Sequence, residues 1–365
     1  MTTICTTTTL DCPTRVLVPW VNYHLNMGID HMYLFFDNPE HPGIAAVAED
    51  SRITCVRCDA EYWPGGAAKR QRLTLHERQW FNANRGLQCA RERNFDWIAH
   101  IDSDELLYFP GRLQETLERL PEKVEVVRFR VFEAIPAQGG SDHPFAQIRY
   151  FRVGPMRPTS KTRPRGLIAW CRAGMHVAGY YSRLGVAKAI GAAGWGPFLR
   201  GHTGGKSAVR VRAPIQGMGV HVPAPPRGRT YLDFFLPHAA LLHYDCADFD
   251  SWLTKWLARA SESHVPRNRD AKRRRQLTRF RAAQNRSAEA VRRLYEREYL
   301  LREWKQRFLM RLGLVREICL PDRWFAETTR AVDIASVASA TVDHTVASGL
   351  IPATPLSGVA RDTRM

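Results

Sequence analysis

The sequence predicts an α/β fold with a mostly parallel sheet that is flanked by helices. Two apolar segments of strand length, HMYLFFD (31–37) and ITCVRC (53–58), stand on either side of a short helical segment at 43–50. A strand, a helix and a second strand in this order are typical of parallel strands joined by a covering helix. A third observation is the buried-strand pattern WIAHI (97–101), which ends at a run of carboxylates.

Further segments extend this alternation. Residues 19–27 predict a short helix, for which Pro19 suits the first position and Gly28 the left-handed cap. Hydrophobic periodicity also predicts helices at 69–93 and 111–120 and a strand at 124–135. We therefore expect a main α/β domain over residues 1–260.

The second half of the sequence is less regular. Residues 136–230 are rich in Gly, Pro and Arg and predict long loops with short strands, and 238–260 predicts a short strand followed by a helix. Residues 261–325 predict a basic helical extension, and 326–365 a poorly ordered tail. The extension has an expected buried stripe formed by Val291, Leu294, Leu301, Trp304, Phe308 and Leu312.

Composition narrows the class of protein. The chain has 365 residues, 44% of them hydrophobic, so it can bury a full core. It contains no apolar run of transmembrane length and no signal-peptide pattern, and its eight cysteines are irregularly spaced, which favours a cytoplasmic protein. The net charge of +17 predicts attraction to polyanions, and it is concentrated in 267–316, with seventeen basic and five acidic residues.

The carboxylates that follow WIAHI are the strongest chemical signal. Asp102-Ser103-Asp104-Glu105 stands where a parallel strand would end, which is the edge at which α/β sheets bind ligands. Two carboxylates at this spacing can share a Mg²⁺ or Mn²⁺ ion, and such an ion can neutralise a diphosphate. We expect Asp102 and Asp104 to hold the metal and Glu105 to orient the loop.

The segment NFDWIAHIDSDELLYF resembles the core motif of the GT-A glycosyltransferases, in particular the family 2-like and family 92 group. The upstream VPWVNYHLNMGIDHMYLFFDN is similar to the same group, as are GKSAVRV, MGVHV and ALLHYDCADFDSWLTKW further on. The resemblance covers roughly residues 15–256. It implies a Rossmann-like GT-A fold, a nucleotide-sugar donor such as a UDP-sugar, a divalent metal and a glycan or other hydroxyl acceptor.

The resemblance also implies roles for individual residues. His243 would approach the metal beside Asp104, and Asp37 would lie near the donor base or ribose. The remaining donor contacts would come from Gln79, Lys206 and Arg210. The transfer is expected to be inverting, and such a transfer needs a base near the acceptor, for which location suggests Glu133, Asp245 or Asp248.

The chain departs from the group's pattern at two turns, Thr9–Pro13 and Asp37–Pro42. These departures predict either a different nucleotide or an inactive enzyme. One alternative is therefore a nucleic-acid- or anionic-membrane-binding protein on an inactive GT-A scaffold, although no specific nucleic-acid motif is present. Another is a nucleotidyl- or phosphotransferase, which would usually carry a Gly-Ser before the carboxylates.

Several other polar residues have structural interpretations. His24 predicts a hydrogen-bonded structural histidine, and Cys55 and Cys58 predict two buried thiols because no second pair stands at zinc spacing. His176, His202 and His221 are expected at solvated loop positions, with lining of the acceptor site as the alternative. The basic helices predict either peripheral contact with anionic lipid or a solvated face.

Overall fold

A computed structural model describes residues 1–136, 145, 147–156, 162–163, 167–194, 197–246, 248–261 and 271–326 of the chain. Met1–Thr328 form one compact unit. The predicted tail lies outside the described residues, except for Ala326.

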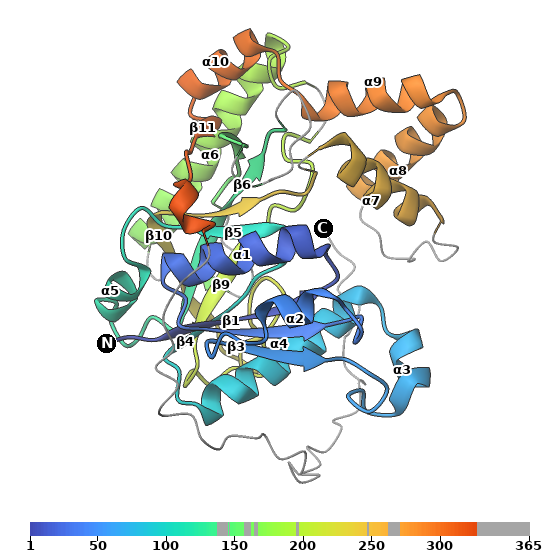
Figure 1. Cartoon of the computed structure of the whole chain (residues 1–365). Coiled ribbons are helices and arrows are strands. Elements are labelled where there is room, and N and C mark those ends of the chain that lie inside the picture. Colours follow the sequence, from blue (N-terminus) through green and yellow to red (C-terminus); the bar gives the residue numbers. More distant parts are fainter. Residues whose placement is uncertain are drawn as a thin grey trace. The chain divides into compact units, whose positions relative to one another are not determined.

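The elements follow one another in the order shown in Figure 1. They are β1 (Ile4–Leu10), α1 (Thr14–Met27), β2 (His31–Phe36), α2 (Gly43–Val47), β3 (Ile53–Arg57), α3 (Gly66–Arg72), α4 (Leu75–Glu92), β4 (Trp97–His100), β5 (Glu105–Tyr108), α5 (Leu113–Glu118), β6 (Val126–Ala134), β7 (Tyr150–Val153), β8 (Thr162–Arg163), α6 (Leu167–Ala189), β9 (Lys206–Arg210), β10 (Tyr231–His243), α7 (Phe249–Ser261), α8 (Ala271–Gln284), α9 (Ala288–Tyr299), α10 (Glu303–Arg311), β11 (Val315–Glu317) and a 3₁₀ turn (Asp322–Trp324).

The central sheet is parallel in one half and mixed in the other. Its main path runs β11-β7-β6-β9-β4-β1-β2-β3. β1 lies between β2 and β4, and β2 lies beside β3, all in parallel. β9 runs antiparallel to both β4 and β6, and β10 pairs parallel with β6 and antiparallel with β5. The α/β class and the parallel strands flanked by helices are therefore confirmed, and the antiparallel strands extend them.

Alternate residues of β2 show how the two faces of the sheet are covered. Met32, Leu34 and Phe36 belong to one hydrophobic cluster, which also contains the buried face of α1. Tyr33 and Phe35 belong to a second cluster, which contains the buried face of α4. Since successive side chains of a strand point to opposite faces, α1 and α4 cover opposite sides of the parallel strands. Both faces of the strands that lead to Asp102 and Asp37 are accordingly buried.

The start of α1 differs from the prediction. Pro19 lies inside the helix, which begins at Thr14 after Pro13. Leu17, in the extra turn, is fully buried in the core, and its packing offsets the hydrogen bond that Pro19 cannot donate. The end was predicted correctly, since Gly28 caps the helix with a φ of 107°.

The region 136–230 contains a 23-residue helix, α6, where loops and short strands were predicted. Its glycines obscure the helical pattern, and its periodic signal is weak because only a narrow stripe is buried. That stripe includes Tyr180, Leu184 and Ala187, which pack with Leu309 of α10. A helix supported by distant residues cannot be recognised from its own sequence.

The basic segment does not form the single predicted stripe. Val291 and Leu294 pack with Trp252 and Trp256 of α7, so this cluster continues across the predicted boundary at residue 260. Leu301, Phe308 and Leu312 pack with α6 instead. Trp304 is exposed, and β11 pairs with β7 in the main sheet. The segment is therefore joined to the α/β core at two places.

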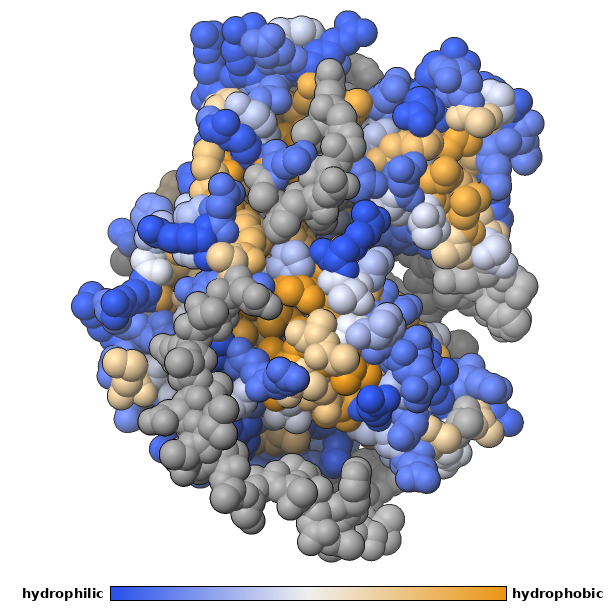
Figure 2. All heavy atoms as spheres, in the orientation of Figure 1, coloured by the Kyte–Doolittle hydropathy of each residue, from blue (hydrophilic) through white to orange (hydrophobic). Residues whose placement is uncertain are grey.

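The outer edges of α9 and α10 are largely hydrophilic in Figure 2. Arg274 and Arg275 of α8 are also exposed. Contact of these helices with anionic lipid stays a prediction. Across the described residues, no helix combines the length and the apolar character needed to cross a bilayer.

His24 is a structural residue of α1, as predicted. Its ring is fully buried, and its Nε2 accepts a hydrogen bond from the Leu107 amide at 3.3 Å. Its Nδ1 therefore carries the proton and donates to the carbonyl of Trp20 at 2.9 Å. Burial lowers the pKa of His24 to about 4, because the imidazolium form loses its hydration.

We expect the His24→Gln variant to show a weaker dependence of stability on pH than the parent. The folded-state pKa lies below the unfolded value, so the unfolded chain binds a proton first, and stability falls as the pH drops from about 6.5 to about 4. The slope assigned to His24 is about 1.4 kcal/mol per pH unit. Urea unfolding between pH 7 and 4.5 measures it. The exposed His76→Gln substitution is the control, and equal slopes in both variants would contradict the assignment.

Candidate metal and donor site

The acidic turn lies at the carboxyl end of β4. All four residues of β4 are buried, and the chain leaves the sheet at Ile101 and Asp102 before β5 begins at Glu105. The Glu105 amide donates to the Asp102 carbonyl at 3.0 Å, and the Asp102 amide donates to Oε2 of Glu105 at 2.8 Å. Glu105 therefore orients the turn, as predicted. The turn also directs Asp102 and Asp104 toward different partners.

Asp102 is held by Gln79 and Lys206. Gln79 Nε2 donates to one carboxylate oxygen at 2.9 Å, and Lys206 Nζ donates to the other at 2.7 Å. Lys206 is fully buried and also lies 3.3 Å from Glu105. Burial alone would raise the pKa of Asp102, but the ammonium of Lys206 outweighs it and holds that pKa below its usual range. Two residues that were predicted to bind the donor thus converge on the acidic turn.

Asp104 faces a second cation and His243. Lys255 Nζ lies 3.1 Å from Asp104 Oδ2 and 2.6 Å from Asp245 Oδ1, so it bridges the two carboxylates. His243 Nε2 lies 3.8 Å from Asp104 Oδ2, which is the proximity expected from the sequence. Burial raises the pKa of Asp104, but the positive charge of Lys255 and then the contribution of His243 outweigh burial, so the pKa lies below its usual value. The carboxyl group is therefore ionised at neutral pH.

Two overlapping groups of side chains could hold a metal ion. One comprises Glu105, His202 and His243, and the other comprises Asp104, His243 and Asp245. In each group the potential ligand atoms lie within 4.8 Å of one another. His202 and His243 each have a buried Nδ1 without a hydrogen-bond partner among the described residues. Carboxylate oxygens with imidazole nitrogens form a donor set that fits a divalent metal such as Mn²⁺.

Asp102 lies outside both groups. Gln79 and Lys206 each donate a hydrogen bond to one of its two oxygens, which leaves each oxygen a further lone pair for a metal. Its role as a metal ligand stays a prediction. Asp104 belongs to one of the two groups and His243 to both, so these two residues are better placed for that role.

Gly201 allows His243 to approach the loop before His202. A Cβ atom at Gly201 would lie 2.4 Å from His243 Cε1 and 2.8 Å from its Nδ1. Both distances are below van der Waals contact, so any side chain at this position must displace the ring.

The Gly201→Ala variant should therefore bind Mn²⁺ about ten-fold more weakly than the parent, because the histidine that both ligand groups share would be moved. Calorimetric titration with Mn²⁺ measures the affinity. Gly185→Ala is the matched control, since nothing lies within 4 Å of an added Cβ there. Unchanged Mn²⁺ affinity in Gly201→Ala would show that His243 is not a ligand.

The three candidate bases are engaged in other interactions. Glu133 is buried, accepts hydrogen bonds from the amides of Arg200 and Gly201 at 2.8 and 2.5 Å, and pairs with Arg152 at 3.5 Å. It holds the loop before His202 in place and does not fit the predicted role of a base. Asp248 Oδ1 accepts a hydrogen bond from the Ser251 amide at 2.7 Å and caps α7, so it does not fit either.

Asp245 is the third candidate base, and Lys255 determines its protonation. Burial raises the pKa of Asp245, but Lys255 outweighs it and lowers the pKa well below its usual range. Such a carboxylate is a weak base at neutral pH. Its role in the transfer stays a prediction.

Among the described residues, neither Asp37 nor Arg210 forms a hydrogen bond or ion pair with the acidic turn. Asp37 follows β2 and pairs with Arg78 at 2.9 Å and Arg70 at 3.5 Å. Arg210 pairs in register with Trp97 at the opposite end of β4, stacks on its ring at 4.5 Å and donates to the Val124 carbonyl at 2.9 Å. The predicted contact of Arg210 with phosphate therefore does not fit its position.

His202 and Lys255 are the main residues that the sequence analysis did not assign to the site. His202 Nε2 lies 2.9 Å from Glu105 Oε1, and its ring packs between His221 and His243, with centroids 4.7 and 4.6 Å away. His202 therefore does not occupy a solvated loop position, although the sequence HTGGK places it only four residues before Lys206. Lys255 lies in the segment ALLHYDCADFDSWLTKW, but the sequence analysis predicts no function for it.

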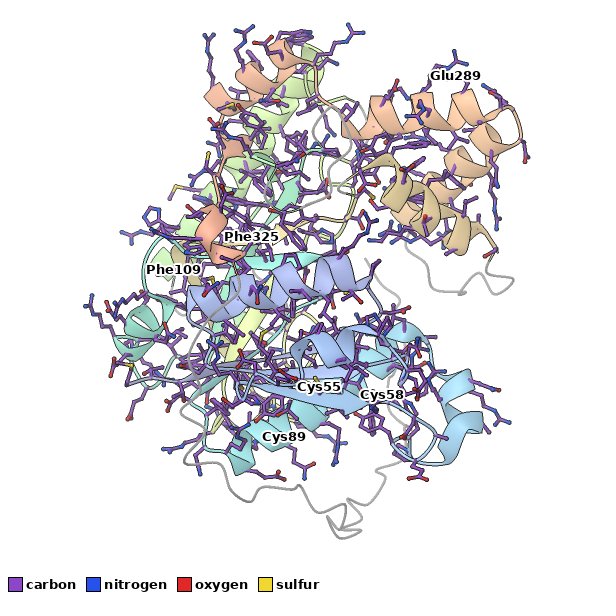
Figure 3. All side chains as sticks on the ribbon, in the orientation of Figure 1. Cys55, Cys58, Cys89, Phe109, Glu289 and Phe325 are labelled. Atoms are coloured by element: carbon purple, nitrogen blue, oxygen red, sulfur yellow. The ribbon has the colours of Figure 1, made fainter. Side chains whose placement is uncertain are left out.

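Cys55 and Cys58 lie on and just after β3 (Figure 3). Cys58 is buried and Cys55 half-buried, and both are free thiols. Burial raises the pKa of Cys55 to about 11 and that of Cys58 to about 12. Neither belongs to a metal-ligand group among the described residues. The predicted burial is confirmed for Cys58 and only in part for Cys55.

Comparison with known proteins identifies distant relatives of this chain. Two of them are described as glycosyltransferase-like. Both come from Arabidopsis thaliana. At2g41451 is 23% identical over 270 residues, which cover 67% of this chain and 54% of the relative. At3g57200 is 22% identical over 169 residues, which cover 41% of this chain and 33% of the relative. The chain thus spans about half, or less, of the length of these relatives, and no family model matches it.

The crystal structure of HddC from Yersinia pseudotuberculosis overlaps 70% of this chain and 97% of its own. Its TM-score is 0.33 at 10% identity. A similarity this low supports no conclusion about this chain.

Proposed function

We propose that this chain is a metal-dependent glycosyltransferase of the GT-A type. It transfers a sugar from a nucleoside diphosphate donor, with a UDP-sugar as the expected donor, to a glycan or other hydroxyl acceptor. The observation that carries the proposal is the pair of possible ligand groups that share His243, beside the turn at the carboxyl end of a parallel strand. One group adds Asp104 and Asp245, and the other adds Glu105 and His202. The similarity of the chain to two glycosyltransferase-like proteins supports the same reaction class.

In this proposal His243 holds a Mn²⁺ or Mg²⁺ ion, either together with Asp104 and Asp245 or together with Glu105 and His202. A bound divalent ion would neutralise the charge that develops on the leaving diphosphate. Lys206 holds Asp102 ionised and fixed, while Gln79 sets the orientation of its carboxylate. Lys255 adds a positive charge 3.1 Å from Asp104, where it can balance the negative charge of a bound phosphate.

The two altered turns predict either a different nucleotide or an inactive enzyme. Asp37 pairs with Arg78 and Arg70, so it can contact the donor ribose only from within this ion-pair network. The expected inverting transfer also needs a base, for which Asp245 is the remaining candidate. Both points concern how the donor is bound and activated, so experiments on donor binding and donor hydrolysis test them.

A panel of nucleotide-sugars tests the proposal directly. We expect release of the nucleoside diphosphate from one donor of the panel with Mn²⁺, and little or none with EDTA. Thermal shift with the same donors provides a second readout that does not require turnover. A shift that is the same with Mn²⁺ and with EDTA, or the absence of any shift or turnover across the panel, would contradict the proposal and favour the inactive-scaffold alternative.

A further inference from the structure

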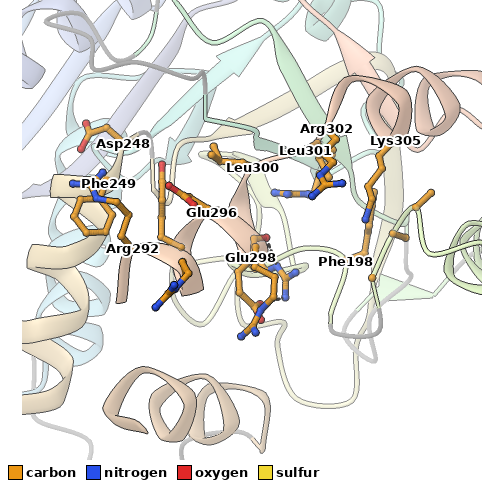
Figure 4. Close-up of a pocket in the computed structure, with 18 of the residues that line it drawn as sticks. Phe198, Asp248, Phe249, Arg292, Glu296, Glu298, Leu300, Leu301, Arg302 and Lys305 are labelled. Atoms are coloured by element: carbon orange, nitrogen blue, oxygen red, sulfur yellow. Dashed lines mark hydrogen bonds and ion pairs between the residues drawn. The ribbon is translucent and has the colours of Figure 1, made fainter. Parts of the chain in front are cut away.

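A large cavity is formed by α9, α10, the start of α7 and the loop before His202. Its volume is about 1150 Å³, which is slightly above the usual range of small-molecule sites. Figure 4 shows Phe249 and Arg292 at one end of this cavity and Phe198, Arg302 and Lys305 at the other. We call it the arginine pocket.

Cations predominate in the arginine pocket. Its seven basic residues exceed its four acidic ones. Among the described residues, no carboxylate lies within ion-pair distance of four of these cations, which are Arg292, Arg297, Arg302 and Lys305. Of the acidic residues, Glu298 pairs with Arg200 and Arg279, whereas Asp248, Asp250 and Glu296 pair with no cation among the described residues. The seven basic residues still leave the pocket with a net positive charge.

Guanidinium groups that line one cavity and outnumber its carboxylates favour an anionic ligand. The planar fork of an arginine matches the two oxygens of a carboxylate or phosphate. Phe198 and Leu301 add apolar surface to the lining, and Phe249 adds an aromatic ring on which the Arg292 guanidinium lies at 4.2 Å. Such surface can pack against the C–H faces of sugar rings, so charge and shape together fit an acidic carbohydrate better than a small inorganic ion.

The arginine pocket shares a wall with the candidate metal site. Arg200 lines the pocket, and its amide donates to Glu133, whose other oxygen accepts from Gly201 beside His243. On the other side, Asp248 follows Asp245 by three residues. A ligand in the pocket would therefore lie next to the residues that are proposed to hold the donor.

We propose that the arginine pocket binds the acceptor, and that the acceptor is an acidic glycan that carries carboxylate or phosphate groups. This inference rests on the proposed function, which supplies the donor and the transfer step. The arginine pocket would position an acceptor hydroxyl near the donor by holding the charged groups of neighbouring sugar units. Part of the basic charge of α9 and α10 would then serve to bind the acceptor.

Calorimetry with the full chain tests this inference. The probes are a hexamer of galacturonate, a hexamer of galactose, hexose 6-phosphate and vesicles of anionic lipid, all at one ionic strength. We expect binding of the galacturonate hexamer or of hexose 6-phosphate, and none of the neutral hexamer. The two acidic sugars distinguish carboxylate from phosphate. The Arg297→Ser/Arg302→Ser variant should weaken this binding by at least about ten-fold, because two charge-assisted contacts are lost.

The matched control is Arg286→Ser/Arg311→Ser, which removes the same charge from exposed positions outside the arginine pocket. It should change the affinity less than about two-fold. Equal weakening in both variants, equal binding of the acidic and neutral hexamers, or binding to vesicles alone would overturn the inference.

Donor hydrolysis with Mn²⁺, measured on the same variants, separates this inference from the proposed function. Hydrolysis that continues while acidic sugars fail to bind overturns only the acceptor assignment. The absence of hydrolysis in the parent chain, with or without binding of acidic sugars, counts against the glycosyltransferase itself.

Discussion

Asp104→Ala is expected to lower metal-dependent donor turnover by at least about 100-fold. Removing an outer hydrogen-bond partner of a metal ligand already costs about 10–100-fold, and Asp104 is proposed to bind the metal directly. Its side chain is 37% exposed, and Lys255 keeps Asp245 as a partner after the change. Stability should therefore change by less than about 1 kcal/mol. Turnover against Mn²⁺ concentration, together with thermal unfolding, provides the measurement.

The control for this change is Glu122→Ala, which removes an exposed carboxylate from the turn before β6. It should leave both turnover and unfolding unchanged. An Asp104→Ala chain with the Mn²⁺ dependence of the parent would show that the metal, if used, binds elsewhere.

Lys206→Met should have the largest effect on stability, a loss of about 3–5 kcal/mol in the free energy of unfolding. The ammonium is fully buried between Asp102 at 2.7 Å and Glu105 at 3.3 Å, and Glu105 is itself fully buried. Removing the cation leaves two neighbouring carboxylates with less compensation in a poorly solvated place. Urea unfolding at pH 7 measures the loss, and the exposed Lys123→Met is the matched control.

A second variant separates lost charge from lost packing. Asp102→Asn in the Lys206→Met background removes one of the two carboxylates and should recover part of the stability. A double variant that is no more stable than Lys206→Met would attribute the loss to packing of the lysine stem, and the ion-pair explanation would be wrong.

The parallel strands and the acidic turn could be predicted from the sequence because their signals are local. The apolar stretch of β4 runs directly into Asp102, and β2 is an unbroken apolar run that ends at Asp37. The α/β class follows from the order of such segments. The pairing of β9 and β10 could not be predicted in the same way, because it depends on strands far away in the sequence.

The charge balance of the site was less predictable. Asp104 and Lys255 are 151 residues apart in the chain, and no local pattern links them. Lys206 and Arg210 show the same limit within one motif. They are four residues apart in an extended strand, about 13 Å, so only Lys206 reaches the acidic turn while Arg210 packs on Trp97.

The cluster around His243 is formed by segments that lie far apart in the sequence and are therefore synthesised at different times. The turn after β4 provides Asp104, the loop before β9 provides His202, and the end of β10 provides His243. No contiguous fragment of the α/β core that ends before β10 contains a complete ligand group. An ion with affinity only for the finished arrangement stabilises the native chain by mass action and leaves partly folded forms unaffected. Mn²⁺ would therefore act as a reporter of completed folding, and its binding would appear only when the last of these segments is in place.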